Sequence, residues 1–295
     1  MKPTVFKGAG VAIVTPMDEN GNTNFPVLKD MLEFQLAHGT DAIIICGTTG
    51  EASAMSDEEH LDVIDFAVKT VNKRVPVVAG TGSNDTRHAI NLSKEAKNRG
   101  VDALLQVTPY YNKTNQTGLI RHFTAIADAT EIPMILYNVP SRTGMTITPE
   151  TYAELAKHPM IVATKEASGN FSAIAKTAAL CGDNLGIYSG NDDQILPVLS
   201  LGGLGVISVL SNVAPQQTHD ICELYFEGKQ AESLALQLKL FPFIESLFCD
   251  VNPIPVKEAM NILGWAAGEC RMPLGTLSDA NKALLKSELA KNGLL

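Results

Sequence analysis

Eight short and almost uniformly apolar segments, separated by amphipathic stretches, predict an α/β fold of the (β/α)8 (TIM) barrel type with a C-terminal helical extension. The segments recur roughly every 20 to 35 residues, which is the interval of strand–helix units. They do not alternate with polar residues, as expected for parallel strands that are covered on both faces. A doubly wound open sheet is the second architecture that fits this pattern.

The predicted strands follow one another through the first two thirds of the chain. They are Gly10–Thr15, Ala42–Cys46, Val75–Ala79, Ala103–Val107, Met134–Tyr137, Ile161–Thr164, Gly186–Tyr188 and Gly205–Ser208. The clearest helical pattern between them begins at Ser56, where Glu59 three residues later completes a capping-box signature. Thr148 followed by Pro149 marks a second helix start.

The strand signal ends after about Tyr225. Three helical patterns follow, at Gln230–Phe248, Val256–Leu263 and Ser278–Asn292. We therefore expect two parts, a catalytic barrel at residues 1–225 and a C-terminal helical domain at residues 226–295.

Composition narrows the class of protein. Of 295 residues, 45% are hydrophobic and 19% charged, which is ordinary for a soluble globular protein. The net charge of −9 argues against a nucleic-acid or anionic-membrane partner, and no segment is long enough to span a bilayer. The five cysteines are widely spaced and form no C-x-x-C pair, as in proteins of the reducing cytosol. We expect a cytoplasmic protein.

Lys165 is a cation at the end of an apolar strand. Burying an ammonium is costly, so such a lysine is pushed toward its neutral form or paired with an anion. A neutral amine is a nucleophile for carbonyl carbon. The alternative is a strand-end lysine that reaches solvent and pairs with Glu166.

Other polar residues fall at the same end of the predicted barrel, where such folds place their chemistry. The N–H groups of the Gly47–Glu51 turn can cup a carboxylate. Tyr137 ends the strand before that of Lys165 and can exchange protons with it. Arg142 is a planar fork suited to a carboxylate. Taken singly, these features are also typical of a plain turn, a packing tyrosine and a surface arginine.

Several other chemistries find no support. Gly8-Ala9-Gly10 lacks the third glycine of a dinucleotide-binding fingerprint, and there is no phosphate-binding G-x-x-x-x-G-K-[ST] motif. The six histidines show no metal-ligand spacing, so we expect neither a cofactor nor a metal.

Five ordered motifs, spread over essentially the whole chain, carry a family resemblance. They are Gly47-Thr48-Thr49-Gly50-Glu51, Thr108-Pro109-Tyr110-Tyr111-Asn112, Tyr137-Asn138-Val139-Pro140-Ser141-Arg142-Thr143-Gly144, Lys165-Glu166-Ala167-Ser168-Gly169-Asn170 and Asn252-Pro253-Ile254-Pro255-Val256-Lys257. With them the chain resembles the dihydrodipicolinate synthase family (4-hydroxy-tetrahydrodipicolinate synthases) of the pyruvate-dependent class I aldolase superfamily.

The resemblance implies a lyase of lysine and diaminopimelate biosynthesis. Lys165 would form a Schiff base with pyruvate, whose carboxylate would rest on Thr48 and Thr49. The resulting enamine would attack the aldehyde of L-aspartate 4-semialdehyde, and the product would cyclise to 4-hydroxy-tetrahydrodipicolinate.

The resemblance also implies roles for the remaining site residues and an assembly. Thr48, Tyr137 and Tyr111 would relay protons, with Tyr111 supplied by a neighbouring subunit of a homotetramer built as a dimer of dimers. Arg142 would hold the semialdehyde carboxylate. Gly190 and Ile207 would line the pyruvate pocket.

One position departs from the lysine-inhibited members of the family. Their effector site corresponds to Ala52, Ser53, Asp57, His60, Asn84, His88 and Tyr110. Regulated relatives carry a carboxylate where His88 stands, and a histidine cannot supply that charge to a ligand ammonium. We expect lysine inhibition to be weak or absent.

Two other functions are compatible with parts of the sequence. N-acetylneuraminate lyases and 2-keto-3-deoxy sugar acid aldolases share the lysine and the tyrosine, but they often have serine in the first loop and lack the arginine. Thr48 and Arg142 therefore favour the synthase. A catalytically silent binding protein would not need the set of Thr48, Tyr111, Tyr137, Arg142 and Lys165.

Overall fold

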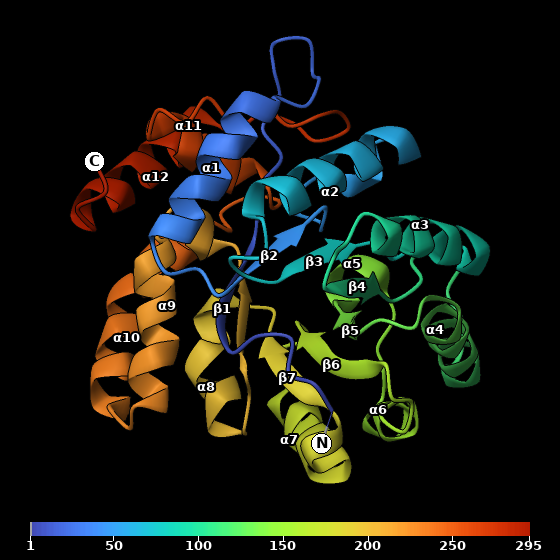
Figure 1. Ribbon diagram of the computed structural model, residues 1–295. Helices are drawn as coiled ribbons and strands as arrows, with labels where there is room; N and C mark the ends of the chain where they lie inside the picture. Colours follow the sequence, from blue (N-terminus) through green and yellow to red (C-terminus); the bar gives the residue numbers. More distant parts are fainter. Residues whose placement is uncertain (1) are drawn as a thin grey trace.

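The computed structural model describes residues 2–295, and within them eight parallel strands close a barrel in sequence order (Figure 1). The strands are β1 (Gly8–Ala12), β2 (Ala42–Ile45), β3 (Val77–Gly80), β4 (Ala103–Val107), β5 (Met134–Asn138), β6 (Ile161–Glu166), β7 (Gly186–Ser189) and β8 (Gly205–Ser208). β1 pairs with β8, which closes the barrel. The predicted (β/α)8 barrel is confirmed, and an open sheet is excluded.

Most strands differ from their predicted bounds by a few residues, and two of them show why. β1 begins at Gly8, whose φ of 119° and lack of a Cβ leave room for the Asp41 carboxylate packed against it. β6 continues through Lys165 and Glu166, because β5 and β7 extend far enough to pair with both residues. Backbone pairing on both sides therefore overrides the weak strand propensity of two charged residues.

Helices surround the barrel (Figure 1). The α-helices are α1 (Phe25–Ala37), α2 (Asp57–Val71), α3 (Thr86–Asn98), α4 (Gln116–Thr130), α5 (Pro140–Thr143), α6 (Pro149–Leu155), α7 (Phe171–Cys181), α8 (Ile195–Ser200), α9 (Pro215–Phe226), α10 (Gln230–Ser246), α11 (Ile254–Ile262) and α12 (Asp279–Lys291). Short 3-10 helices lie at η1 (Ala52–Ala54), η2 (Gly182–Asn184), η3 (Asp192–Gln194) and η4 (Leu210–Asn212).

The two predicted helix starts are present. The Ser56 hydroxyl accepts from the N–H of Glu59 at the start of α2, and Thr148 accepts from Thr151 at the start of α6. The capping box at Ser56 is only half formed, because the Glu59 carboxylate turns away to accept from Thr23 and Arg271. A tertiary ion pair has taken the place of the local contact.

The core has two layers, as the alternation of side chains along each strand requires. Ile43 belongs to the cluster between strands and helices, and Ile44 to the cluster inside the barrel. Tyr137, Tyr188 and Ile207 also lie in the inner cluster. Burying one such side chain contributes about 1.5–3 kcal/mol, so the filled barrel is a rigid support for its open end.

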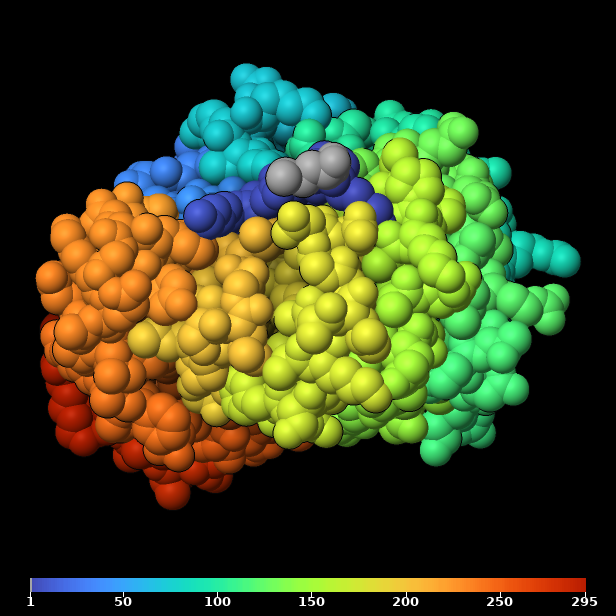
Figure 2. All heavy atoms as spheres, turned by 90° about the horizontal axis from the view of Figure 1, so that it is seen from below, coloured from blue at the N-terminus to red at the C-terminus, as the bar shows by residue number. Residues whose placement is uncertain are grey.

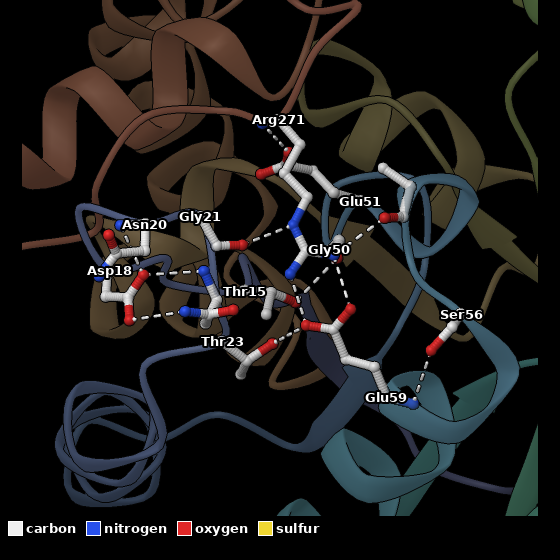
Figure 3. A network of polar contacts seen from close by, with 12 residues as sticks. Thr15, Asp18, Asn20, Gly21, Thr23, Gly50, Glu51, Ser56, Glu59 and Arg271 are labelled. Carbon is white, nitrogen blue, oxygen red and sulfur yellow. Dashed lines mark hydrogen bonds and ion pairs between the residues drawn. The ribbon is translucent and has the colours of Figure 1, made fainter.

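The two ends of the barrel are covered differently. Seen from below, the N-terminal segment, in dark blue, crosses the lower face (Figure 2). There Phe6 stacks on Tyr188, with ring centroids 4.3 Å apart. Helix α10 packs beside α9, α12 packs against α10 and α11, and the chain between α11 and α12 brings Arg271 to Gly21 and Glu59 (Figure 3). No helix in residues 2–295 is long and apolar enough to cross a membrane.

Candidate active site

Lys165 lies at the carboxyl end of β6 and is only 6% exposed. In the parallel register it stands directly opposite Tyr137 of β5. Its Nζ lies over the Tyr137 ring, 4.4 Å from the centroid. The sequence predicted that the two residues end neighbouring strands, and the structure confirms this. The ring face, rather than the phenol oxygen, is what meets the ammonium here, a favourable cation–π arrangement.

Glu166 is not the partner of Lys165. It is the next residue along the strand and therefore points to the opposite face of the sheet. There its buried carboxylate accepts from Asn138 Nδ2 at 3.0 and 3.1 Å, from the Tyr152 hydroxyl at 3.1 Å and from the N–H of Ser168 at 2.9 Å. The exposed lysine–glutamate pair is thus excluded.

This buried group fixes the backbone that carries the two reactive side chains. Asn138 and Glu166 are register partners one step beyond Tyr137 and Lys165, so their contact aligns the ends of β5 and β6. Burial, followed by the nearby Glu166 carboxylate, raises the pKa of Tyr152 and keeps its hydroxyl a donor. No local sequence pattern indicates these roles for Asn138 and Tyr152, because their partners come from other strands and helices.

Gly190 lies against the Lys165 side chain, and Ile207 lies in the interior of the barrel. A Cβ at Gly190 would lie 3.2 Å from Lys165 Cε and 2.7 Å from the Ala167 Cβ. A larger residue would therefore displace the lysine or fill the space next to it. Ile207 is completely buried in the inner cluster on β8.

The Gly47–Glu51 turn follows β2. Its backbone closes with bonds from the N–H of Gly50 to the oxygen of Gly47 and from Glu51 to Thr48. Thr48 is exposed, and Thr49 beside it is buried. Glu51 adopts a left-handed conformation with φ of 57°, unusual for a residue with a side chain. The turn presents its two threonines to different environments.

Glu51 is held from the C-terminal helices. Its Oε1 accepts from Lys257 Nζ at 2.8 Å, and both side chains are buried. Its Oε2 accepts from the N–H of Arg271 at 2.8 Å, a contact drawn in Figure 3. These contacts explain how the strained backbone of the turn is maintained. The sequence gives no local signal for them, because the partners are more than 200 residues away.

Arg142 lies in the short helix α5 after β5 and is exposed. Its Nη2 donates to the backbone oxygen of Asn252 at 3.0 Å. Arg142, Thr48 and Tyr137 line one cavity of about 480 Å³. The structure thus brings Thr48 and Arg142 to the same cavity as Tyr137, and the Lys165 amine lies against the ring of that tyrosine.

Several predicted site residues do not line this cavity. Lys165, Thr49, Gly190 and Ile207 are buried or partly buried near it, whereas Tyr111 is exposed. Its side chain is 93% exposed, and its neighbour Tyr110 lines the cavity instead. The backbone of Tyr111 is left-handed, with φ of 67°. Strained backbone conformations of this kind cluster at functional sites.

A second group of polar residues lines the same cavity, at positions of the predicted effector site. His88 donates from Nε2 to Asp57 at 2.9 Å, and its Nδ1 lies 3.1 Å from the Ser83 hydroxyl. His60 donates to the oxygen of Gly80, and burial lowers the pKa of His60. The carboxylate of Asp57 is therefore already paired within the chain.

Asp192 is a buried acid at the carboxyl end of the barrel, and no sequence motif marks it. Its Oδ2 accepts from the N–H groups of Val209 and Leu210 at 3.0 and 2.9 Å. These contacts tie the loop after β7 to the end of β8. Burial raises the pKa of its carboxyl, while these hydrogen bonds and the Lys165 charge oppose that rise.

An eight-stranded barrel with a buried lysine and a facing tyrosine at its open end defines a class of enzyme, the lyases of the class I aldolase superfamily. The model of the dihydrodipicolinate synthetase family matches residues 5–292. The chain belongs to this family.

Relatives and solved structures agree over almost the full length. A 4-hydroxy-tetrahydrodipicolinate synthase of Caldicellulosiruptor saccharolyticus is 56% identical over 290 residues, 98% of each chain. A dihydrodipicolinate synthase of Acinetobacter baumannii, solved with pyruvate, superposes with a TM-score of 0.97 at 40% identity, covering 99% of this chain and 100% of that one. The enzyme of Cyanidioschyzon merolae, solved with lysine bound, gives 0.97 at 37% identity and the same coverage.

Proposed function

We propose that the chain condenses pyruvate with L-aspartate 4-semialdehyde through a Schiff base on Lys165, forming 4-hydroxy-tetrahydrodipicolinate. This is a lyase activity of lysine and diaminopimelate biosynthesis. The observation that carries the mechanism is Lys165 itself, a buried amine beneath Tyr137 and beside the space left by Gly190.

The amine of Lys165 attacks the keto carbon of pyruvate, and the carbonyl oxygen leaves as water. Loss of a methyl proton gives an enamine, whose carbon bonds to the aldehyde carbon of the second substrate. Release from Lys165 and ring closure complete the reaction. Each step needs a proton moved at the bound carbonyl or hydroxyl, and Tyr137 is the side chain directly opposite Lys165.

The other residues divide between proton transfer and binding. Thr48 and Tyr137 line the cavity and relay protons with Tyr111 of a neighbouring subunit. The Thr48–Thr49 turn holds the pyruvate carboxylate, and Arg142 holds the semialdehyde carboxylate. Gly190 and Ile207 form the wall that limits the pocket around the pyruvate methyl group. The exposed guanidinium of Arg142 favours this aldehyde over the uncharged aldehydes of sugar aldolases.

An assembly follows from Tyr111. Because the exposed Tyr111 lies away from its own cavity, it serves a neighbouring subunit, and we propose a homotetramer built as a dimer of dimers.

We place the enzyme in the cytoplasm and divide it into the barrel, residues 1–225, and the helical domain, residues 226–295. Because His88 occupies the Asp57 carboxylate, lysine is a poor inhibitor.

Borohydride trapping tests the proposal. Reduction in the presence of pyruvate should attach pyruvate irreversibly to Lys165, located by peptide mass spectrometry. Lys165→Ala should lose the label, and its kcat should fall by roughly 10³-fold or more. Lys176→Ala, which alters an exposed lysine, should keep both label and activity. A wild-type enzyme that turns over both substrates without a trapped adduct would refute the Schiff base.

A further inference from the structure

Asn252 contacts both side chains that are proposed to bind substrate carboxylates, and it does so with two different groups. Its side-chain Nδ2 donates to Thr49 Oγ1 at 3.0 Å. Its backbone oxygen accepts from Arg142 Nη2 at 3.0 Å. Asn252 is 7% exposed and lies just before α11, in the C-terminal part of the chain. One residue of the helical extension therefore reaches the pyruvate turn and the semialdehyde-binding arginine together.

The hydrogen bond from Asn252 determines where the Thr49 hydrogen can point. A hydroxyl has one hydrogen to donate and lone pairs to accept. Because Asn252 Nδ2 is itself a donor, it occupies a lone pair of Thr49 Oγ1, and the hydroxyl hydrogen must point elsewhere. Among residues 2–295 no acceptor for that hydrogen is found. The hydroxyl is thus a donor held ready for an acceptor from outside the chain.

The other atom of the Asn252 amide shows that stability alone does not account for this residue. Its Oδ1 is buried and has no hydrogen-bond partner in the part of the chain that the structure describes. A buried acceptor without a partner destabilises the folded state. An apolar side chain here would remove this defect but would also remove the donor that Thr49 receives. The arrangement favours the orientation of Thr49 over the stability of the fold.

We propose that Asn252 is a positioning residue for pyruvate: its amide directs the Thr49 hydroxyl hydrogen to the pyruvate carboxylate. This inference rests on the proposed function, because it takes the Thr49 turn as the carboxylate site. The contact with Arg142 uses the backbone oxygen of Asn252, which every substitution retains. Changes to the Asn252 side chain therefore affect pyruvate and spare the semialdehyde.

Steady-state kinetics of Asn252→Ala test this separation. The KM for pyruvate should rise roughly tenfold, the order expected when a charge-assisted hydrogen bond is weakened. The KM for the semialdehyde should stay within about twofold, because Arg142 keeps its carbonyl partner. Equal rises in both KM values, or a fall in kcat alone, would overturn the proposal.

Asn252→Asp is the sharper variant, because it keeps the size of the side chain and reverses its hydrogen bonding. A carboxylate accepts the Thr49 hydrogen and also repels the pyruvate carboxylate. Its KM for pyruvate should exceed that of Asn252→Ala. A wild-type pyruvate KM in Asn252→Asp would show that the amide accepts from Thr49 rather than donates to it, and would overturn the proposal.

Thr49→Val tests the same contact from its other side. If Asn252 acts through Thr49, adding Asn252→Ala to Thr49→Val should cause no further rise in the pyruvate KM. Fully additive effects would mean that Asn252 acts by another route. Should Asn252→Ala fold poorly, the comparison of Asn252→Asp with Thr49→Val still decides the question.

Asn261→Ala is the matched control within the same extension. Asn261 exchanges two hydrogen bonds with Gly268 and contacts neither Thr49 nor Arg142. It should lower the melting temperature and leave the pyruvate KM unchanged. Trapping of pyruvate on Lys165 in the wild-type enzyme separates the two hypotheses. A trapped adduct with unaltered KM values in the Asn252 variants would refute the role of Asn252 alone.

Discussion

A carboxylate near each end of strand β2 makes hydrogen bonds and an ion pair to distant parts of the chain, and the two ion pairs differ in burial. At the base, Asp41 accepts from the N–H of Ala9 at 2.7 Å and from His219 Nδ1 at 2.9 Å. At the mouth, Glu51 accepts from Lys257 and from the backbone of Arg271. The Asp41 and His219 side chains are 23% and 21% exposed, whereas those of Glu51 and Lys257 are 1% and 2% exposed.

This difference in exposure determines how much each ion pair contributes to stability. Water near Asp41 can solvate either charge if its partner is lost, so the base pair contributes little and responds to pH and salt. At the buried Glu51–Lys257 pair, water cannot solvate the charge that remains when its partner is lost, so the turn with Thr48 and Thr49 is held with little freedom. The buried Glu51–Lys257 pair therefore holds the turn beside the proposed active site rigidly. The Asp41–His219 pair, at the opposite end of the barrel, is sensitive to its solvent conditions.

The largest expected effect comes from removing one charge at the mouth. Glu51→Gln leaves the Lys257 ammonium buried without its anion, and the free energy of unfolding should fall by about 3–5 kcal/mol. Urea denaturation followed by circular dichroism measures this. The double variant Glu51→Leu with Lys257→Met should recover most of the loss. A loss below about 1 kcal/mol for Glu51→Gln would mean that the two ends do not differ as described.

At the base, the expected effect is smaller and depends on pH. The hydrogen bond to Asp41 and the charges of Asp41 and Glu223 raise the pKa of His219 from 6.5 to about 9. A raised pKa in the folded state stabilises it fully below pH 6.5, and this stabilisation is lost as the pH rises through about 9. The loss should be about 1 kcal/mol, since solvent screens the partly exposed pair. Denaturation of the wild type and His219→Gln at both pH values measures it, and a wild-type gain in relative stability at high pH would contradict the assignment.

The smallest effect is the response to salt. The stability difference between the wild type and His219→Gln at pH 6.5 should shrink by a few tenths of a kcal/mol when salt is raised to about 1 M. The difference between the wild type and Glu51→Gln should not change, because the buried pair is shielded from ions. Denaturation midpoints at low and high salt compare the two. An equal salt response at both ends would remove the distinction between them.

Sequence patterns predicted those features that depend on neighbours along the chain or on strand order. Apolar runs located each strand, and the order of the strands placed Tyr137 beside Lys165. Strand ends were less accurate, because Lys165 and Glu166 stay in the ladder through pairing with β5 and β7. Local charge and propensity carry no information about such pairing.

Contacts between distant residues were beyond sequence reasoning. The capping-box pattern predicts a local partner for Glu59, yet its carboxylate meets Arg271, 212 residues away. The motif that contains Asn252 gives no indication of its bond to Thr49, which spans 203 residues. No periodicity marks these pairs, since each depends on how the C-terminal helices dock against the finished barrel.

The docking of the C-terminal segment against the turn after β2 also bears on how such chains can be recombined. Asn252, Lys257 and Arg271 all contact residues of the Gly47–Glu51 turn. A crossover between two homologous genes anywhere from residue 51 to residue 252 would take the turn from one parent and its three supports from the other. To keep these contacts matched, a chimeric enzyme would have to take the turn and the tail from the same parent, although most of the barrel lies between them.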